Sequence, residues 1–156
     1  MTSALQVSPE LHAEIASFYA RHMRAMDEGR VEDWTGDFTD DGVFITNAGP
    51  APQIGRAAIT AGAGVAAANL LSDNVLRRHC LTTLDIRPQP DGTILASSYA
   101  IIVRTPPGGP TAVEFLCTCE DELVRQDGQL LIRHRRVQRD DLVFATPTIR
   151  PLHDSA

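Results

Sequence analysis

The sequence lacks the groupings of residues that metal, redox or covalent chemistry usually requires. Its three cysteines, Cys80, Cys117 and Cys119, do not have the spacings of zinc sites or of thioredoxin-like motifs. There is no glycine-rich phosphate loop, no serine-centred nucleophile elbow and no metal-binding triad. Covalent and metal-dependent mechanisms are therefore unsupported, and the sequence predicts neither a metal nor a cofactor.

Long apolar segments and an excess of positive charge are also lacking. Residues 1–6 have no cationic region followed by an apolar core, and the most apolar later stretch, 61–71, is short and interrupted by glycines. The 14 Lys and Arg against 20 Asp and Glu give a formal net charge of -6, which repels polyphosphates and anionic lipids. We therefore expect neither nucleic acid nor a membrane as a partner, and we expect a cytoplasmic protein.

A chain of 156 residues is long enough for one sizeable core and too short for two. No repeat, low-complexity tract or linker marks a domain boundary. We therefore predict a single domain over residues 1–156, with its core at about 10–142 and a C-terminal tail at 143–156.

The first half of the chain predicts three helices. Ser8, Pro9 and Glu10 form a helix start, because the Ser hydroxyl can accept a free amide and Pro suits the first turn. Apolar residues then recur at spacings of three and four until Gly29, which is typical of one helix face. The positions on this face are Leu11, Ile15, Phe18, Tyr19, His22 and Met26.

Two shorter segments complete this half. Residues 31–38 predict a second helix, and the turn at 40–42 leads into a strand at 43–46. Residues 56–71 predict the third helix, although Gly62 and Gly64 each weaken it by about 1 kcal/mol relative to Ala.

The second half predicts antiparallel strands joined by hairpins. Runs of branched and aromatic residues alternate with turns rich in Pro, Gly and Asp. The runs are 77–87, 93–105, 111–125 and 129–139. Helices followed by a meander of strands indicate an α+β fold, and strands of this length require strong twist and bending. A bent sheet closed on one side by helices leaves a pocket.

His79 is the candidate general base, because imidazole has the side-chain pKa nearest neutrality. Alternation places His79, Leu81, Thr83 and Asp85 on one face of the first long strand, but both faces are similarly apolar, so His79 could also be a structural residue. Asp27 could hold such a His in the correct tautomer. Spacing alone does not bring Asp27 and His79 together, and Asp27 could equally be a solvated helix end.

Other polar residues have mainly structural interpretations. Tyr19 and Tyr99 could donate a hydrogen bond to a substrate carbonyl, but buried tyrosines more often anchor packing. Cys117 and Cys119 are most simply small core residues on one strand face. In the basic segment 133–136, alternation places Arg133 and Arg135 on one face. The acidic residues 120–122 and 140–141 could pair with this segment, although it could also bind a carboxylate or phosphate.

The chain as a whole resembles the SnoaL-like branch of the nuclear transport factor 2-like superfamily. The resemblance covers about residues 10–142. Its motifs are Phe18-Tyr19, Ala25-Met26-Asp27-Glu28-Gly29, Asp33-Trp34, Phe38-Thr39-Asp40-Asp41-Gly42-Val43-Phe44, Arg78-His79-Cys80-Leu81-Thr82-Thr83, Glu120-Asp121-Glu122-Leu123-Val124-Arg125-Gln126-Asp127-Gly128 and Arg136-Val137.

This resemblance implies a cone-shaped α+β barrel, in which about three helices pack on a strongly curved antiparallel sheet around an apolar pocket. It also implies a homodimer or higher homo-oligomer built through the sheet. Members similar to scytalone dehydratase and hexachlorocyclohexane dehydrochlorinase use an Asp and a His whose matching positions are Asp27 and His79. In these members the His removes a proton next to a carbonyl or leaving group, and the Asp orients the His.

The chain departs from the family pattern at two pocket positions. Thr83 stands where an Asn is frequent, and Cys119 stands where a Tyr is common. With Tyr19, Trp34 and Tyr99, Cys119 is a candidate substrate-binding residue. We predict a cofactor-independent dehydratase, cyclase or isomerase acting on a hydrophobic, carbonyl-bearing small molecule such as a polyketide or aromatic intermediate. The alternative is a non-catalytic small subunit of a ring-hydroxylating dioxygenase, or a ligand-binding scaffold.

Overall fold

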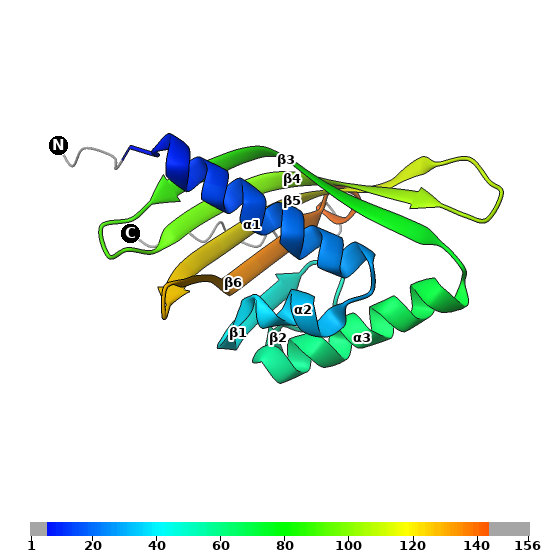
Figure 1. Cartoon of the computed structure of the whole chain (residues 1–156). Coiled ribbons are helices and arrows are strands. Elements are labelled where there is room, and N and C mark those ends of the chain that lie inside the picture. Colours follow the sequence, from blue (N-terminus) through cyan, green and yellow to red (C-terminus); the bar gives the residue numbers. More distant parts are fainter. Residues whose placement is uncertain (1–5, 144–156) are drawn as a thin grey trace.

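Figure 1 shows three helices packed against one face of a strongly bent sheet. The structure is a computed structural model and describes residues 6–143, so all of the expected tail 143–156 except Val143 lies outside the described residues. The elements are α1 (Pro9–Asp27), α2 (Val31–Gly36), β1 (Phe38–Thr46), β2 (Gln53–Ile54), α3 (Arg56–Ser72), β3 (Leu76–Pro88), β4 (Ile94–Thr105), β5 (Ala112–Gln126), β6 (Gln129–Arg139) and a 3₁₀ helix, Asp140–Leu142.

The six strands form one sheet in the order β2-β1-β6-β5-β4-β3. The four long strands form the predicted meander, and the α+β class is confirmed. The prediction of an antiparallel sheet is wrong at β1, which pairs with β6 in parallel because the chain crosses over through α3 before the meander begins. In the part of the chain that the structure describes, β2 and β3 are the two edges, so the cone-shaped sheet does not close into a barrel.

Helix α1 begins where the sequence predicts. The Ser8 hydroxyl accepts a hydrogen bond from the Leu11 amide at 3.1 Å, and Pro9 occupies the first turn. The helix ends at Asp27, and Gly29 follows with a φ of 71°, which glycine adopts without a steric penalty. The last turn of α1 therefore holds Asp27 beside the edge strand β3, and this position defines the site described below.

The connection between α2 and β1 differs from the prediction. Helix α2 ends at Gly36 rather than at residue 38, and β1 begins at Phe38 because the Ile132 amide already donates to the Asp37 carbonyl at 2.8 Å. The predicted turn at 40–42 appears as a register shift between Phe38 and Val43 within β1. The short strand β2 was not predicted.

Two irregularities overturn expectations that assumed perfect alternation. In β3 the register shifts between Thr82 and Asp85, and Thr83 has a φ of 54°. Asp85 is therefore exposed and does not share the face of His79, whereas Leu84 packs against the core. In β6 a shift at Arg133 separates it from Arg135, so Arg133 is exposed and Arg135 is buried.

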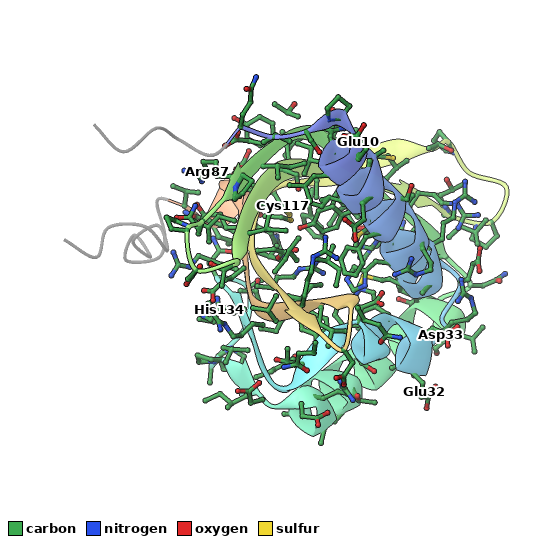
Figure 2. The ribbon with its side chains drawn as sticks, turned by 60° about the vertical axis from the view of Figure 1, so that its left-hand side comes forward. Glu10, Glu32, Asp33, Arg87, Cys117 and His134 are labelled. Carbon is green, nitrogen blue, oxygen red and sulfur yellow. The ribbon has the colours of Figure 1, made fainter. Side chains whose placement is uncertain are left out.

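The core fills the space between α1 and the inner face of the sheet. Figure 2 shows side chains crowding this space, with Cys117 inside the bend of the sheet and Glu32 and Asp33 outside. The largest fully buried side chains include Phe38, Ile15, Ile59 and Leu123. α3 contributes only Ile59 to the buried set, so it covers one end of the sheet without filling the core. A cavity remains at that end.

Candidate active site

A cavity of about 350 Å³ lies between the inner face of the sheet and the helices. Most of its wall is apolar, and the exceptions are Thr46, His79 and three arginines. The lining residues are Met23, Met26, Trp34, Phe44, Thr46, Ala48, Ala66, Arg77, His79, Leu81, Ala100, Ile102, Phe115, Cys117, Cys119, Arg135, Val137 and Arg139. A mostly apolar cavity with a few convergent polar groups is typical of a small-molecule site.

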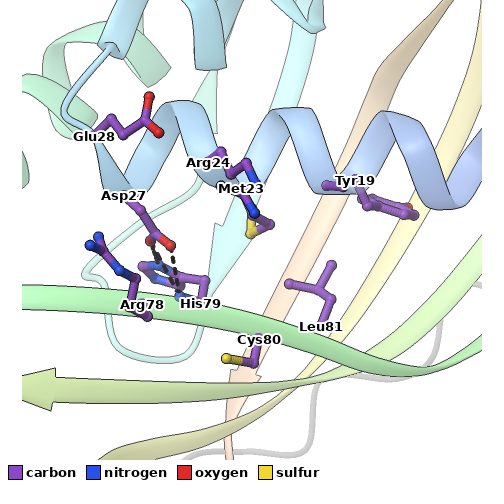
Figure 3. Close-up of a pocket in the computed structure, with 10 residues that line it drawn as sticks. Tyr19, Met23, Arg24, Asp27, Glu28, Arg78, His79, Cys80 and Leu81 are labelled. Carbon is purple, nitrogen blue, oxygen red and sulfur yellow. Dashed lines mark hydrogen bonds and ion pairs between the residues drawn. The ribbon is translucent and has the colours of Figure 1, made fainter. Parts of the chain in front are cut away.

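His79 lines this cavity and contacts Asp27 at the end of α1. The two residues also line a neighbouring pocket, which Figure 3 shows. The imidazole Nδ1 lies 2.7 Å from Asp27 Oδ1. The same carboxylate accepts the backbone N–H of His79, at 3.2 Å to Oδ1 and 3.1 Å to Oδ2. This amide is available because β3 is an edge strand, so no further strand within residues 6–143 pairs with it. One carboxylate therefore fixes both the backbone and the ring of His79.

The geometry determines which nitrogen of His79 can act as a base. A carboxylate only accepts hydrogen bonds, so the Nδ1 next to Asp27 carries the proton in the neutral ring. Nε2 then keeps its lone pair and can take a proton from a bound molecule. The side chains of His79 and Asp27 are 15% and 9% exposed, so a ligand can reach the ring while little water surrounds the pair.

A second polar cluster is buried beneath the cavity floor. Arg135 donates from Nε and Nη2 to Asp121, at 2.8 and 2.7 Å, and Tyr19 donates its hydroxyl to the same carboxylate at 2.8 Å. Arg135 Nη1 lies 2.8 Å from His22 Nε2, and His22 Nδ1 lies 2.9 Å from Asp37. The cluster joins α1 to β5 and β6, and it fills the hydrogen-bonding positions of His22 and Asp121 that would otherwise be unpaired.

Burial and charge set the ionisation of this cluster. Burial, aided by the positive charge of Arg135, lowers the pKa of His22 to about 4, so this imidazole is neutral at pH 7. Burial opposes the charge on Arg135, but Asp121 outweighs it and the pKa of Arg135 lies above its ordinary value. Burial and the Asp121 charge raise the pKa of Tyr19. Neutral His22 thus donates from Nδ1 to Asp37 and accepts from Arg135.

The lowered pKa of His22 predicts a loss of stability in acid. Between pH 6.5 and about 4 the unfolded chain binds a proton at His22 and the folded chain does not, so stability falls as the pH falls through this window. On going from pH 7 to 4.5, urea unfolding should show wild type losing roughly 2 kcal/mol more than His22→Gln, which has no titrating ring. Equal losses in the two proteins would contradict the buried neutral state.

Of the other predicted site residues, two line the cavity and two do not. Trp34 and Cys119 line the cavity; burial raises the pKa of the Cys119 thiol to about 12. Tyr19 does not line this cavity. Its hydroxyl is bonded to Asp121, and Tyr19 lines the neighbouring pocket together with Asp27 and His79. Tyr99 does not line this cavity: its neighbour Ala100 faces inward, so alternation along β4 turns Tyr99 outward, where it is 51% exposed.

Sequence reasoning missed several lining residues. Arg77 precedes His79 by two positions on β3, so the alternation that placed His79 already implied that Arg77 shares its face. Phe115 and Arg139 carried no signal of this kind, because their meeting depends on the pairing of β5 with β6. Trp34 Nε1 is buried and has no hydrogen-bond partner among residues 6–143.

No group of three metal-ligating side chains occurs among residues 6–143. Within the same range, no helix is both long and apolar enough to cross a membrane.

Comparisons with known proteins give one family and a consistent set of structures. The model of the SnoaL-like domain matches residues 8–136, and a search of curated proteins finds no match. Aln2 from a Streptomyces species is similar over 89% of this chain and 97% of its own, with 36% identity and a TM-score of 0.82. A Catenulispora acidiphila protein solved in complex with S-DNPA has 36% identity and a TM-score of 0.77, covering 89% of this chain and 100% of its own.

A more distant structure identifies the fold. The NTF2-like protein from Novosphingobium aromaticivorans, described as having a cystatin-like fold, matches with a TM-score of 0.73 and 23% identity over 85% of this chain and 83% of its own. The expected NTF2-like fold is therefore confirmed.

Proposed function

This chain belongs to the SnoaL-like family, and from that premise we propose that it is a cofactor-independent acid-base enzyme, a dehydratase or cyclase acting on a hydrophobic, carbonyl-bearing small molecule. The observation that carries the proposal is that His79, paired with Asp27, lines an apolar cavity. The structure of a similar protein in complex with S-DNPA supports ligand binding by this fold.

In the proposed reaction His79 Nε2 removes a proton from the carbon next to the carbonyl, and the electron pair moves into an enolate. Asp27 stabilises the imidazolium that forms, and the low polarity of the cavity strengthens this interaction. In a dehydration the enolate then expels the β-hydroxyl, which leaves as water after taking the proton back from His79.

A simple β-hydroxyketone tests this proposal. In 3-hydroxy-1-tetralone, loss of the proton at C2 and of the hydroxyl at C3 gives a conjugated ketone, which tautomerises to 1-naphthol by losing a proton from C4 and gaining one on oxygen. The fluorescence of 1-naphthol reports the reaction. We expect the protein to accelerate naphthol formation above the buffer rate, with saturation in substrate. Binding without turnover would favour the ligand-binding scaffold, and copurification with a larger iron–sulfur oxygenase subunit would favour the small-subunit alternative.

We also propose that two copies associate through the outer face of the sheet. This face carries apolar side chains that a monomer leaves in water: Tyr99, Val113 and Leu116 are 51%, 61% and 45% exposed. Leu116→Glu should convert the dimer to a monomer in light scattering after size exclusion, because a charge would be buried at its centre. Leu71→Glu, on exposed α3, is the matched control, and a wild-type monomer would overturn this proposal.

A further inference from the structure

Two arginines and a phenylalanine line one end of the cavity. The Arg139 guanidinium carbon lies 3.7 Å from the centre of the Phe115 ring, and that of Arg77 lies 5.9 Å from it. The three side chains come from β6, β3 and β5, and all line the cavity that contains His79. An aromatic ring flanked by two cations is an unusual lining for an otherwise apolar wall.

Both guanidiniums are held in place but keep free donors. Arg77 donates from Nε and Nη2 to Glu114, at 2.8 Å for each contact. Arg139 donates from the same two nitrogens to Asp141, at 3.0 and 2.6 Å. A guanidinium has five N–H donors, and in each arginine Nη1 has no hydrogen-bond partner within residues 6–143. Glu114 and Asp141 thus fix the two planes and leave the Nη1 edges available.

The third arginine of the cavity wall is different. Arg135 is 4% exposed at its side chain, and its Nε, Nη1 and Nη2 all have partners in the buried cluster. Arg77 and Arg139 have side chains that are 24% and 25% exposed, so a ligand can reach them. The available positive donors of the cavity therefore lie at the end that contains Phe115.

We propose that the substrate is a free aromatic carboxylic acid, whose carboxylate binds Nη1 of Arg77 and Arg139 and whose adjoining ring packs near Phe115. This inference rests on the proposed function and names its substrate class. Arg77 and His79 are two positions apart on one face of β3, so the carboxylate lies beside the base. Charge-assisted hydrogen bonds at this point would orient the reacting carbon toward Nε2. Esters and amides of the same acid would lack the anchor.

Matched probes test the proposal without a catalytic assay. Calorimetric titration should show that wild type binds 2-naphthylacetate at least about tenfold more tightly than neutral 2-naphthylacetamide. Arg77→Gln and Arg139→Gln should each reduce this preference several-fold and leave the affinity for the amide nearly unchanged. Arg125→Gln is the control, since it removes one charge and one arginine–carboxylate pair, that with Glu14, outside the cavity.

The outcomes separate this inference from the proposed function. Equal affinity of wild type for acid and amide overturns it, and this comparison needs no variant to fold. An acid preference that survives both substitutions, or that Arg125→Gln also removes, overturns it as well. His79→Gln should keep the acid preference, because binding of the carboxylate does not use the base. An active enzyme without acid preference would leave the proposed function standing and this substrate class wrong.

Discussion

Replacement of His79 by glutamine is expected to lower kcat/KM for dehydration of 3-hydroxy-1-tetralone by about 10²–10⁴-fold, the usual contribution of a positioned general base. Glutamine keeps a polar side chain that can donate to Asp27, so the strand and the carboxylate should stay in place. What it lacks is the lone pair of Nε2 at neutral pH. Naphthol fluorescence measures the rate, and a thermal melt checks the fold of the variant.

His12→Gln is the matched control for this experiment. His12 is exposed on α1 and lines none of the cavity, so its replacement should leave kcat/KM unchanged. Asp27→Asn should give an intermediate loss, because an amide can still orient the ring but cannot stabilise the imidazolium by charge. A His79→Gln enzyme as active as wild type would remove His79 from the mechanism.

The second large effect concerns stability. Asp121→Ala is expected to lower the free energy of unfolding by about 3–5 kcal/mol, because it leaves the Arg135 charge buried without its partner. The hydroxyl of Tyr19 loses its acceptor in the same variant. Urea unfolding, followed by fluorescence of the single tryptophan, Trp34, measures the change.

Two further variants show whether the effect comes from the buried charge. Glu14→Ala breaks the exposed pair with Arg125 and should cost at most about 1 kcal/mol. Asp121→Leu combined with Arg135→Met should be less destabilising than Asp121→Ala alone, since no charge remains unpaired. If Asp121→Ala lost no more than Glu14→Ala, the buried cluster would not have the role assigned to it.

Much of the fold followed from local patterns in the sequence. The start of α1 follows from Ser8 and Pro9, and the hairpins of the meander follow from turn residues, since both depend on neighbours in the chain. The direction of β1 could not be predicted in this way, because it depends on a crossover through α3. The register shifts at Thr83 and Arg133 could not be predicted either, because the alternation rule assumes that no extra residue is inserted in a strand.

The site was predictable to a smaller extent. The spacing of residues identified His79 as a candidate, but only the resemblance paired it with Asp27, because the helix end and the strand are 52 positions apart. The outward position of Tyr99 could not be predicted, because the strand's own pattern does not say which face of β4 turns inward; Ala96 and Ala100 are buried, whereas Tyr99 is 51% exposed. His22 was assigned only to a helix face, since its hydrogen bonds run to Asp37 and Arg135, which pattern reasoning could not place.

The most direct test of the central claim, that Nε2 of His79 removes a proton next to a bound carbonyl, is deuterium exchange at C2 of 1-tetralone in D2O, followed by proton NMR. This ketone has no leaving group, so exchange reports the base alone. The account predicts that wild type accelerates exchange above the buffer rate and that His79→Gln returns it to that rate. Equal acceleration by wild type and a folded His79→Gln variant would contradict it.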